Sequence, residues 1–273
     1  MTPTRLKVLR YFLFKNRNHV SVSELRKFFF DASYHTKADR FIKSNERIGE
    51  LNRVYFKGYD EPLYYPSDFP VKSLEQVAVE SFYPENWHYY EVPETRINES
   101  DVVVDCGAAE GLFTFLVKMR CKEIFLIEPV KKFCRSLQKT FENNIRVKII
   151  PVALSEKEGF ANISEHDISS SLTVGDQSAE SVTVTTLDKL FYEKNIPISY
   201  IKMDLEGFDY EALLGAAELI KKNKPKIAVT TYHKFEHAEQ ISNYLKSIVP
   251  AYNIKVKGIY QETGSPVMLH AWI

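Results

Sequence analysis

The sequence lacks several features that mark membrane proteins and disulfide-rich proteins. No stretch of its 273 residues approaches the roughly 18 consecutive apolar residues of a membrane-spanning helix. The opening MTPTRLKVLRYFLFKNRN has neither a long apolar stretch nor a small-residue cleavage site. Cysteine is scarce, and the three present, Cys106, Cys121 and Cys134, match no metal-ligand spacing. We therefore expect a cytoplasmic protein without a membrane span, whose cysteines are core residues.

The chain as a whole also lacks an excess of positive or negative charge, but the charges are unevenly distributed along it. Lys plus Arg and Asp plus Glu number 36 each, so the net charge is zero. Residues 1–60 nevertheless hold 13 basic and six acidic residues, a surplus of seven positive charges. Such a segment can contact nucleic acid, an anionic membrane or an acidic partner. A solvated helical surface is the alternative that we favour.

Glycine is infrequent, with 10 residues, and two of them fall in one short turn. In VVVDCGAAEGLFTF (Val102–Phe115), a run of β-formers ends at Asp105 and a helical stretch follows Gly111. Gly107 and Gly111 let the backbone approach a ligand, and the helix start offers unpaired N–H groups. In a doubly wound sheet, ligands bind at this end of the strands. The turn is therefore the predicted ligand site.

The spacing of these glycines favours S-adenosylmethionine (SAM) over a dinucleotide. The second glycine of a G-x-G-x-x-G pattern is absent, and Glu110 at the helix start repels phosphate. Glu128 ends the next strand, 21 residues after Gly107, where a carboxylate can accept hydrogen bonds from ribose hydroxyls. Asp105 would face the sulfonium and ammonium groups. The predicted cofactor residues are Asp105, Gly107, Ala108, Glu110, Gly111, Glu128, Pro129, Ala153 and Asp204.

Strands and helices alternate from residue 101 onward, which predicts a doubly wound, mostly parallel α/β sheet. Expected strands cover 102–106, 123–128, 145–152, 199–205 and 226–232, and expected helices cover 110–119, 131–142, 186–194, 209–222 and 236–247. GFANISEH and SVTVTTL add two short strands. AYNIKVKGIY and PVMLHAWI follow each other without a helix, so they form an antiparallel hairpin. This ending matches the Rossmann-like, class I methyltransferase sheet of seven strands.

The first 66 residues are expected to form an appendage to this domain. Residues 1 to about 50 show helical spacing of apolar residues, with Ser23 as a candidate N-cap. Residues 53–66 indicate a hairpin, and a helix capped by Ser73 should follow. We therefore divide the chain into a helical N-terminal appendage with a hairpin (1–66) and a methyltransferase domain (67–273).

Several stretches together resemble the FkbM-type methyltransferases. They are VVVDCGAAEGLFT, IFLIEP, PVALSEKEG, VTTLDKL, KPKIAVTTYHKFEHAEQI and, most specifically, YIKMDLEGFDYEALLGA. The resemblance covers roughly residues 70–273. It implies SAM-dependent O-methylation of a hydroxyl on a sugar, glycan or natural product. Cys106 and Glu110 depart from the family pattern, in which Val or Ile and Asn are more usual.

The segment YIKMDLEG carries the candidate catalytic residues. With strand periodicity, Lys202, Asp204 and Glu206 share one face. Charged residues at the end of a buried parallel strand are expensive unless they are paired or functional. Asp204 is the favoured functional residue. Glu206 can equally be a substrate residue or a helix-start carboxylate, and a Lys202–Asp204 or Lys202–Glu206 ion pair is the structural alternative.

His233 follows the next strand and is the predicted general base, oriented by Asp204. Mg²⁺ held by Asp204 and Glu206 is the alternative way to activate the acceptor hydroxyl. The aromatic segment YPENWHYYEVP, before the first core strand, is either a packing lid or a wall over the ligand. In the second case Trp87, His88 and Tyr89 contact the substrate.

Two other function classes compete with methyl transfer. An NAD-type oxidoreductase is disfavoured by the broken glycine pattern and the C-terminal hairpin. A non-catalytic, nucleic-acid-binding regulator could use the basic N-terminal helices, but Asp105, Glu128 and Asp204 argue for a working enzyme. We therefore expect a small-molecule or glycan acceptor rather than nucleic acid. A homo-oligomer is compatible with the apolar stripes of the first helices.

Overall fold

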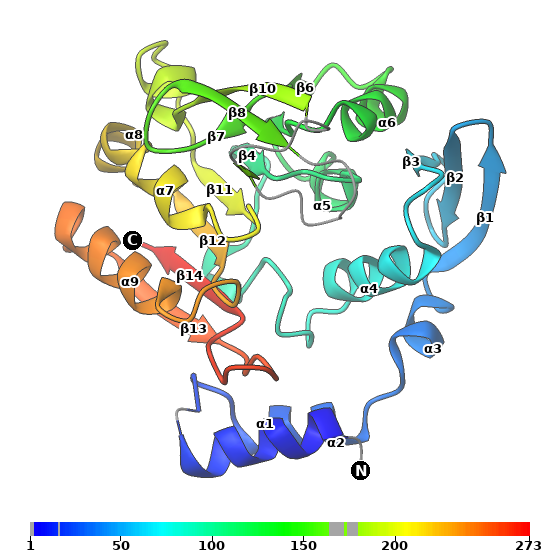
Figure 1. Cartoon of the computed structure of the whole chain (residues 1–273), viewed down its shortest axis with the longest axis vertical. Coiled ribbons are helices and arrows are strands. Elements are labelled where there is room, and N and C mark those ends of the chain that lie inside the picture. Colours follow the sequence, from blue (N-terminus) through cyan, green and yellow to red (C-terminus); the bar gives the residue numbers. More distant parts are fainter. Residues whose placement is uncertain (1–2, 16, 164–171, 174–179) are drawn as a thin grey trace.

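A mostly parallel seven-stranded sheet forms the centre of the molecule (Figure 1). The computed structural model describes residues 3–15, 17–163, 172–173 and 180–273. The strand order is β13-β14-β12-β11-β4-β5-β6. The strands are β4 (Val102–Cys106), β5 (Glu123–Ile127), β6 (Val147–Ile150), β11 (Tyr200–Met203), β12 (Lys226–Thr230), β13 (Asn253–Lys257) and β14 (Met268–Trp272). The predicted fold class is confirmed.

The C-terminal hairpin closes the sheet as predicted, but its last strand is not at the edge. β14 lies between β12 and β13 and runs antiparallel to both. The other described neighbours in this sheet pair in parallel. β14 is therefore an interior strand, and β13 forms the edge of the sheet.

Helices cover both faces of the sheet, because successive side chains of each buried strand point to opposite faces. In β4, Val103 joins a core with α5 and α6, whereas Val102 and Val104 join a second core with α7, α8 and α9. The helices are α5 (Leu112–Val117), α6 (Lys131–Phe141), α7 (Asp209–Leu214), α8 (Ala217–Asn223) and α9 (His237–Ile248). The expected helix 186–194 is a shorter π-helix, η2 (Asp188–Tyr192).

The helix expected over 209–222 is divided in two at Gly215. A Cβ atom at Gly215 would lie 2.3 Å from the carbonyl oxygen of Ser155. The backbone therefore approaches the neighbouring segment closely at this point, and α8 starts again at Ala217.

The N-terminal part contains more strand than its sequence suggests. Its elements are α1 (Pro3–Phe14), α2 (Val22–Phe30), α3 (Tyr34–Ala38), β1 (Ile42–Ile48), β2 (Leu51–Phe56), β3 (Leu63–Pro66) and α4 (Val71–Phe82). The β2–β3 hairpin was expected, but the helical prediction is wrong for β1, which pairs antiparallel with β2. Ser21, not Ser23, caps α2 through a capping box with Glu24. Pro70 precedes α4, and Ser73 lies inside it.

The boundary proposed at residue 66 does not separate two cores. Phe56, Leu63 and Tyr65 belong to the same buried cluster as Leu112 of α5. The Tyr64 amide also donates a hydrogen bond to the Thr140 hydroxyl of α6 (2.9 Å). The three-stranded sheet is thus an extension of the main core.

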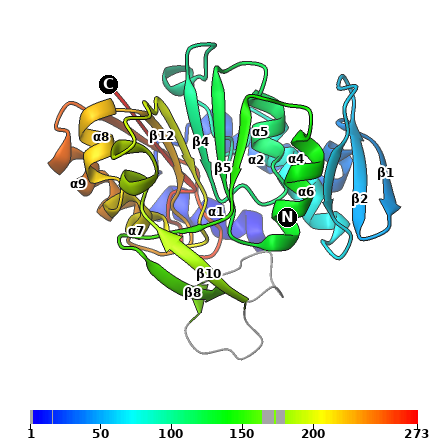
Figure 2. The same ribbon diagram turned by 90° about the horizontal axis from the view of Figure 1, so that it is seen from above.

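A smaller sheet lies beside the main one in Figure 2. Its order is β7-β10-β8-β9, with β7 (Ala153–Leu154), β8 (Gly159–Ile163), β9 (Leu172–Thr173) and β10 (Glu180–Thr185). The two expected short strands correspond to β8 and β10, although 164–166 of GFANISEH lie outside the described residues. A 3-10 turn, η1 (Pro93–Thr95), precedes β4. No helix in the described ranges is long and apolar enough to cross a membrane.

Candidate active site

The turn after β4 is held closely against two neighbouring strands. The amides of Gly107 and Ala108 donate to the carbonyl of Ile127 at the end of β5 (3.0 and 3.2 Å). Gly107 has a φ of +74°, and a Cβ atom there would lie 2.0 Å from the Asp204 carbonyl oxygen. Only glycine fits this position without a shift of the backbone.

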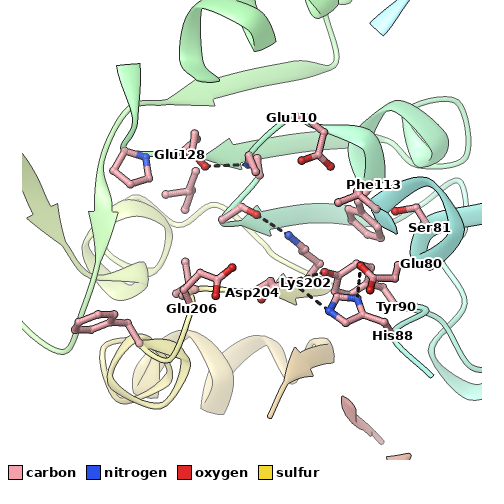
Figure 3. Close-up of a pocket in the computed structure, with 18 of the residues that line it drawn as sticks. Glu80, Ser81, His88, Tyr90, Glu110, Phe113, Glu128, Lys202, Asp204 and Glu206 are labelled. Atoms are coloured by element: carbon pink, nitrogen blue, oxygen red, sulfur yellow. Dashed lines mark hydrogen bonds and ion pairs between the residues drawn. The ribbon is translucent and has the colours of Figure 1, made fainter. Parts of the chain in front are cut away.

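A cavity opens over this turn at the carboxyl ends of the strands (Figure 3). Its wall combines α4, the segment before β4, the turn itself and the residues after β5, β6 and β11. The predicted cofactor residues on this wall are Gly107, Ala108, Glu110, Glu128, Pro129, Ala153 and Asp204. Asp105 and Gly111 lie behind it, so any contribution they make to binding is indirect.

Glu128 is a buried carboxylate with fixed orientation. Its Oε2 accepts a hydrogen bond from the Ala109 amide (2.8 Å) and its Oε1 accepts one from the Val130 amide (2.9 Å). Burial raises the pKa of Glu128 to about 7, and it also raises the pKa of Glu110 to about 7. Two cavity carboxyls therefore change charge near neutral pH.

Asp105 stabilises the turn from below. It is fully buried, and its Oδ2 accepts a hydrogen bond from the Thr114 hydroxyl (2.8 Å). Its Oδ1 lies 3.0 Å from the ammonium of Lys202, which also donates to the Gly107 carbonyl (2.6 Å). The ion pair expected for Lys202 thus forms with Asp105. The direct contact that we expected between Asp105 and the cofactor is not offered by this geometry.

Asp204 also lines the cavity, and its carboxylate accepts two hydrogen bonds. The hydroxyls of Tyr90 and Thr230 donate to its Oδ2 and Oδ1 (2.7 and 3.0 Å). Burial opposes its ionisation, but electrostatic attraction from the neighbouring His88, Lys202 and His233 side chains holds the pKa of Asp204 below its usual value. The side chain is therefore a fixed anion at neutral pH.

His88 lies between two carboxyl groups on the cavity wall (Figure 3). Its Nε2 is 3.6 Å from Asp204 Oδ2, and its Nδ1 is 3.9 Å from Glu80 Oε2. The ring also packs edge-on against Tyr90, with centroids 5.2 Å apart. Burial raises the pKa of Glu80. This cluster faces the same cavity as Glu128.

Trp87 and Tyr89, the other two residues of this segment that were predicted to contact the substrate, point elsewhere. Trp87 stacks on Phe28 of α2, with ring centroids 4.8 Å apart. Tyr89 lines a second cavity together with Arg120. Trp87 and His88 lie in a turn, which is closed by a hydrogen bond from the Tyr89 amide to the Asn86 carbonyl (3.2 Å). Of this segment, His88 and Tyr90 line the main cavity. Sequence reasoning missed Tyr90, Glu80 and Tyr232, which also line the cavity.

His233, the base predicted from the sequence, is engaged in an ion pair. Its Nε2 lies 2.9 Å from Glu206 Oε2. Burial opposes protonation of the ring, but the hydrogen bond to Glu206 and the charge of Asp204 outweigh it and raise the pKa of His233 to about 9. Glu206 lines the cavity and His233 does not. At neutral pH His233 is therefore a cation behind the wall, which is unsuited to accept a proton.

Asp204, Glu206 and His233 are also the one group in the described ranges whose donor atoms lie close enough together for a metal ion, within 4.8 Å. Both Asp204 oxygens already accept hydrogen bonds, and Glu206 is paired with the protonated imidazole. Mg²⁺ prefers oxygen ligands in an octahedral shell. This arrangement satisfies its own charges and does not fit a preformed Mg²⁺ site.

Comparison with known families gives a match to the methyltransferase FkbM domain over residues 105–250. The chain belongs to the FkbM methyltransferase family. The family predicted from the sequence is thus confirmed. A comparison with curated proteins gives no match.

One solved structure supports the fold assigned to this FkbM family member. The methyltransferase FkbM from Methylobacillus flagellatus KT is similar to it with a TM-score of 0.50 and 21% identity. That match covers 91% of this chain but only 60% of the other. An rRNA methylase from Streptococcus thermophilus matches with a TM-score of 0.43 and 12% identity, over 64% of this chain and 88% of the other. The precorrin-6y C5,15-methyltransferase of Geobacter metallireducens GS-15 matches with a TM-score of 0.41 and 9% identity, over 77% of this chain and 94% of the other.

Proposed function

We propose that this chain is a SAM-dependent O-methyltransferase that acts on a hydroxyl of a sugar, glycan or natural product. One observation carries the proposal. Glu128, fixed by two amides, shares a cavity with the polar cluster around Asp204 and His88. Glu128 would hold the ribose hydroxyls, and the polar cluster would receive the acceptor hydroxyl.

The charges of the cavity support a cationic cofactor. Its wall carries carboxyl groups of Glu80, Glu110, Glu128, Asp204 and Glu206. The cavity-lining Lys202 is committed to Asp105 and to the turn. An environment rich in carboxylates attracts a sulfonium and disfavours the pyrophosphate of NAD. The oxidoreductase alternative is correspondingly less favourable.

His88 is better placed than His233 to accept the acceptor proton. SAM, when bound, supplies a methyl group that is activated by its positive sulfur. The acceptor proton passes to His88 Nε2, and the nearby carboxyl groups of Asp204 and Glu80 stabilise the imidazolium that results. Tyr90 and Thr230 keep Asp204 in place. Much of the rate comes from alignment of the two reactants.

Calorimetry with SAM, S-adenosylhomocysteine (SAH) and NAD⁺ tests the cofactor. We expect binding of SAM and SAH and none of NAD⁺. The acceptor is then sought by mass spectrometry of cell extracts incubated with SAM and the protein, where the product is heavier by one methyl group. Failure to bind SAH, or binding of NAD⁺ alone, would refute the proposal.

A further inference from the structure

The first two helices expose apolar side chains that the fold does not use. In α1, Leu6, Leu13 and Phe14 are 58%, 55% and 80% exposed, and in α2, Val22 and Phe30 are 68% and 83% exposed. These five are more than a third of the 14 large hydrophobic side chains exposed in the described part of the chain. We call them, together with the basic residues of both helices, the α1–α2 surface.

The opposite side of the helices already has a packing partner. Val8 and Phe12 are buried in a small core with Val20, Leu25 and Ile259. The Asn18 side chain also donates hydrogen bonds to two backbone carbonyls of the C-terminal segment, at residues 258 and 264 (3.0 Å each). The helices are thus fixed in place at the lower edge of the view in Figure 1. The outward apolar residues remain available for another contact.

Basic residues accompany this apolar set. Residues 3–30 contain seven Lys or Arg and one acidic residue, Glu24, in a chain of zero net charge. Lys7 and Lys27 are paired with Glu262 (3.0 Å) and, more loosely, with Glu85 (3.9 Å). Arg10 and Arg26 make no ion pair within the described ranges. Arg10 also lies on the same helical stripe as Leu6 and Leu13.

We propose that the α1–α2 surface docks on an anionic lipid bilayer. Membrane-surface binding needs two contributions, namely apolar side chains that enter the interface and basic side chains that attract anionic headgroups. This surface offers both. Nucleic acid would use the basic residues but leave Phe14 and Phe30 in water. A second copy would place two surfaces with the same positive surplus against each other.

Sedimentation of the full chain with lipid vesicles tests the proposal. We expect binding to vesicles of phosphatidylcholine mixed with phosphatidylglycerol, weaker binding at high salt, and none to phosphatidylcholine alone. The double variant Arg10→Gln, Arg26→Gln should lower binding about twenty-five-fold, because each basic residue near an anionic surface contributes about fivefold. Phe14→Ser with Phe30→Ser should also weaken binding, but should keep its salt dependence.

Ile145→Ser is the matched control, since Ile145 is 94% exposed and far along the chain from α1 and α2. It should bind vesicles like the wild type, and SAH binding verifies that each variant is folded. Absence of binding to anionic vesicles, or variants that bind as well as the control, would overturn the proposal. Salt-sensitive binding to duplex DNA without vesicle binding, or self-association removed by the Phe14→Ser, Phe30→Ser change, would assign the surface to another partner.

Discussion

The affinity for SAH should depend on pH through the buried carboxyl groups of the cavity. The pKa values of Glu128 and Glu110 are both raised to about 7, so each group is about half protonated at neutral pH in the free protein. Glu128 must be ionised to accept hydrogen bonds from both ribose hydroxyls while it retains its bonds from the Ala109 and Val130 amides. SAH then binds to the form of the protein in which Glu128 is ionised, and protonation of Glu128 at acidic pH competes with SAH binding.

The size of the effect follows from the linkage between the proton and the ligand. If one carboxyl must ionise, affinity falls about tenfold between pH 8 and pH 6, which corresponds to about 1.4 kcal/mol. If Glu110 and Glu128 must both ionise, the fall is about a hundredfold. Above pH 8 the affinity should level off, because both groups are then already charged.

Isothermal titration calorimetry with SAH across this pH range measures the effect directly. Glu128→Gln should bind more weakly at pH 8 by about 1–3 kcal/mol and lose most of the pH dependence. Glu110→Gln separates the two groups, since it removes only the part that belongs to Glu110. An affinity that stays flat from pH 6 to pH 8 in the wild type, or an unaltered affinity in Glu128→Gln, would refute the assignment of Glu128 to the ribose.

Four further outcomes are expected. Gly107→Ala should abolish SAH binding, or destabilise the fold in a melting curve, because the new Cβ would meet the Asp204 carbonyl at 2.0 Å. His88→Asn should lower the rate of methyl transfer from SAM to an acceptor in the extract by about 10²–10⁴, with SAH affinity unchanged. The control His19→Asn, at an exposed position, should not alter the rate. An equal loss in His233→Asn would favour His233, the general base predicted from the sequence. EDTA should leave that transfer intact, and a loss restored by Mg²⁺ would contradict our interpretation of the acidic cluster. The pKa of His233 is raised to about 9 from 6.5, so its protonation contributes about 3 kcal/mol to the free energy of unfolding. This contribution is complete below pH 6.5 and is lost as pH rises through about 9. Urea unfolding of wild type and His233→Asn at several pH values measures it.

Much of the site could be predicted from the sequence, because the end of a strand can be recognised from the residues immediately around it. Glu128 follows an apolar run at a fixed distance from Gly107, and both line the cavity. The ion-pair partner of Lys202 could not be predicted in this way. Lys202 lies opposite Asp105 in the register between β11 and β4, and that register depends on contacts between segments far apart in sequence.

Two other errors have the same origin. β1 is a strand because β2 provides its hydrogen-bonding partner, although most of its side chains are exposed and show no alternation. His88 faces the cavity while Trp87 and Tyr89 do not, because the path of the segment before β4 is fixed by distant contacts, such as the hydrogen bond from the Tyr200 hydroxyl to the Tyr90 carbonyl (2.6 Å). Local propensity carries no information about either contact.

The insertion of β14 between β12 and β13 has a consequence for how the chain folds. β14 follows β13 in the chain but lies between β12 and β13, so β13 has no neighbour in the sheet until β14 has been synthesised. The docking of Asn18 onto residues 258 and 264 likewise joins segments about 240 positions apart. Contacts of such sequence separation close late and slowly. In a nascent chain, β12 therefore remains an open edge until β14 is made, and loss of β14 would leave β13 without a neighbour in the sheet.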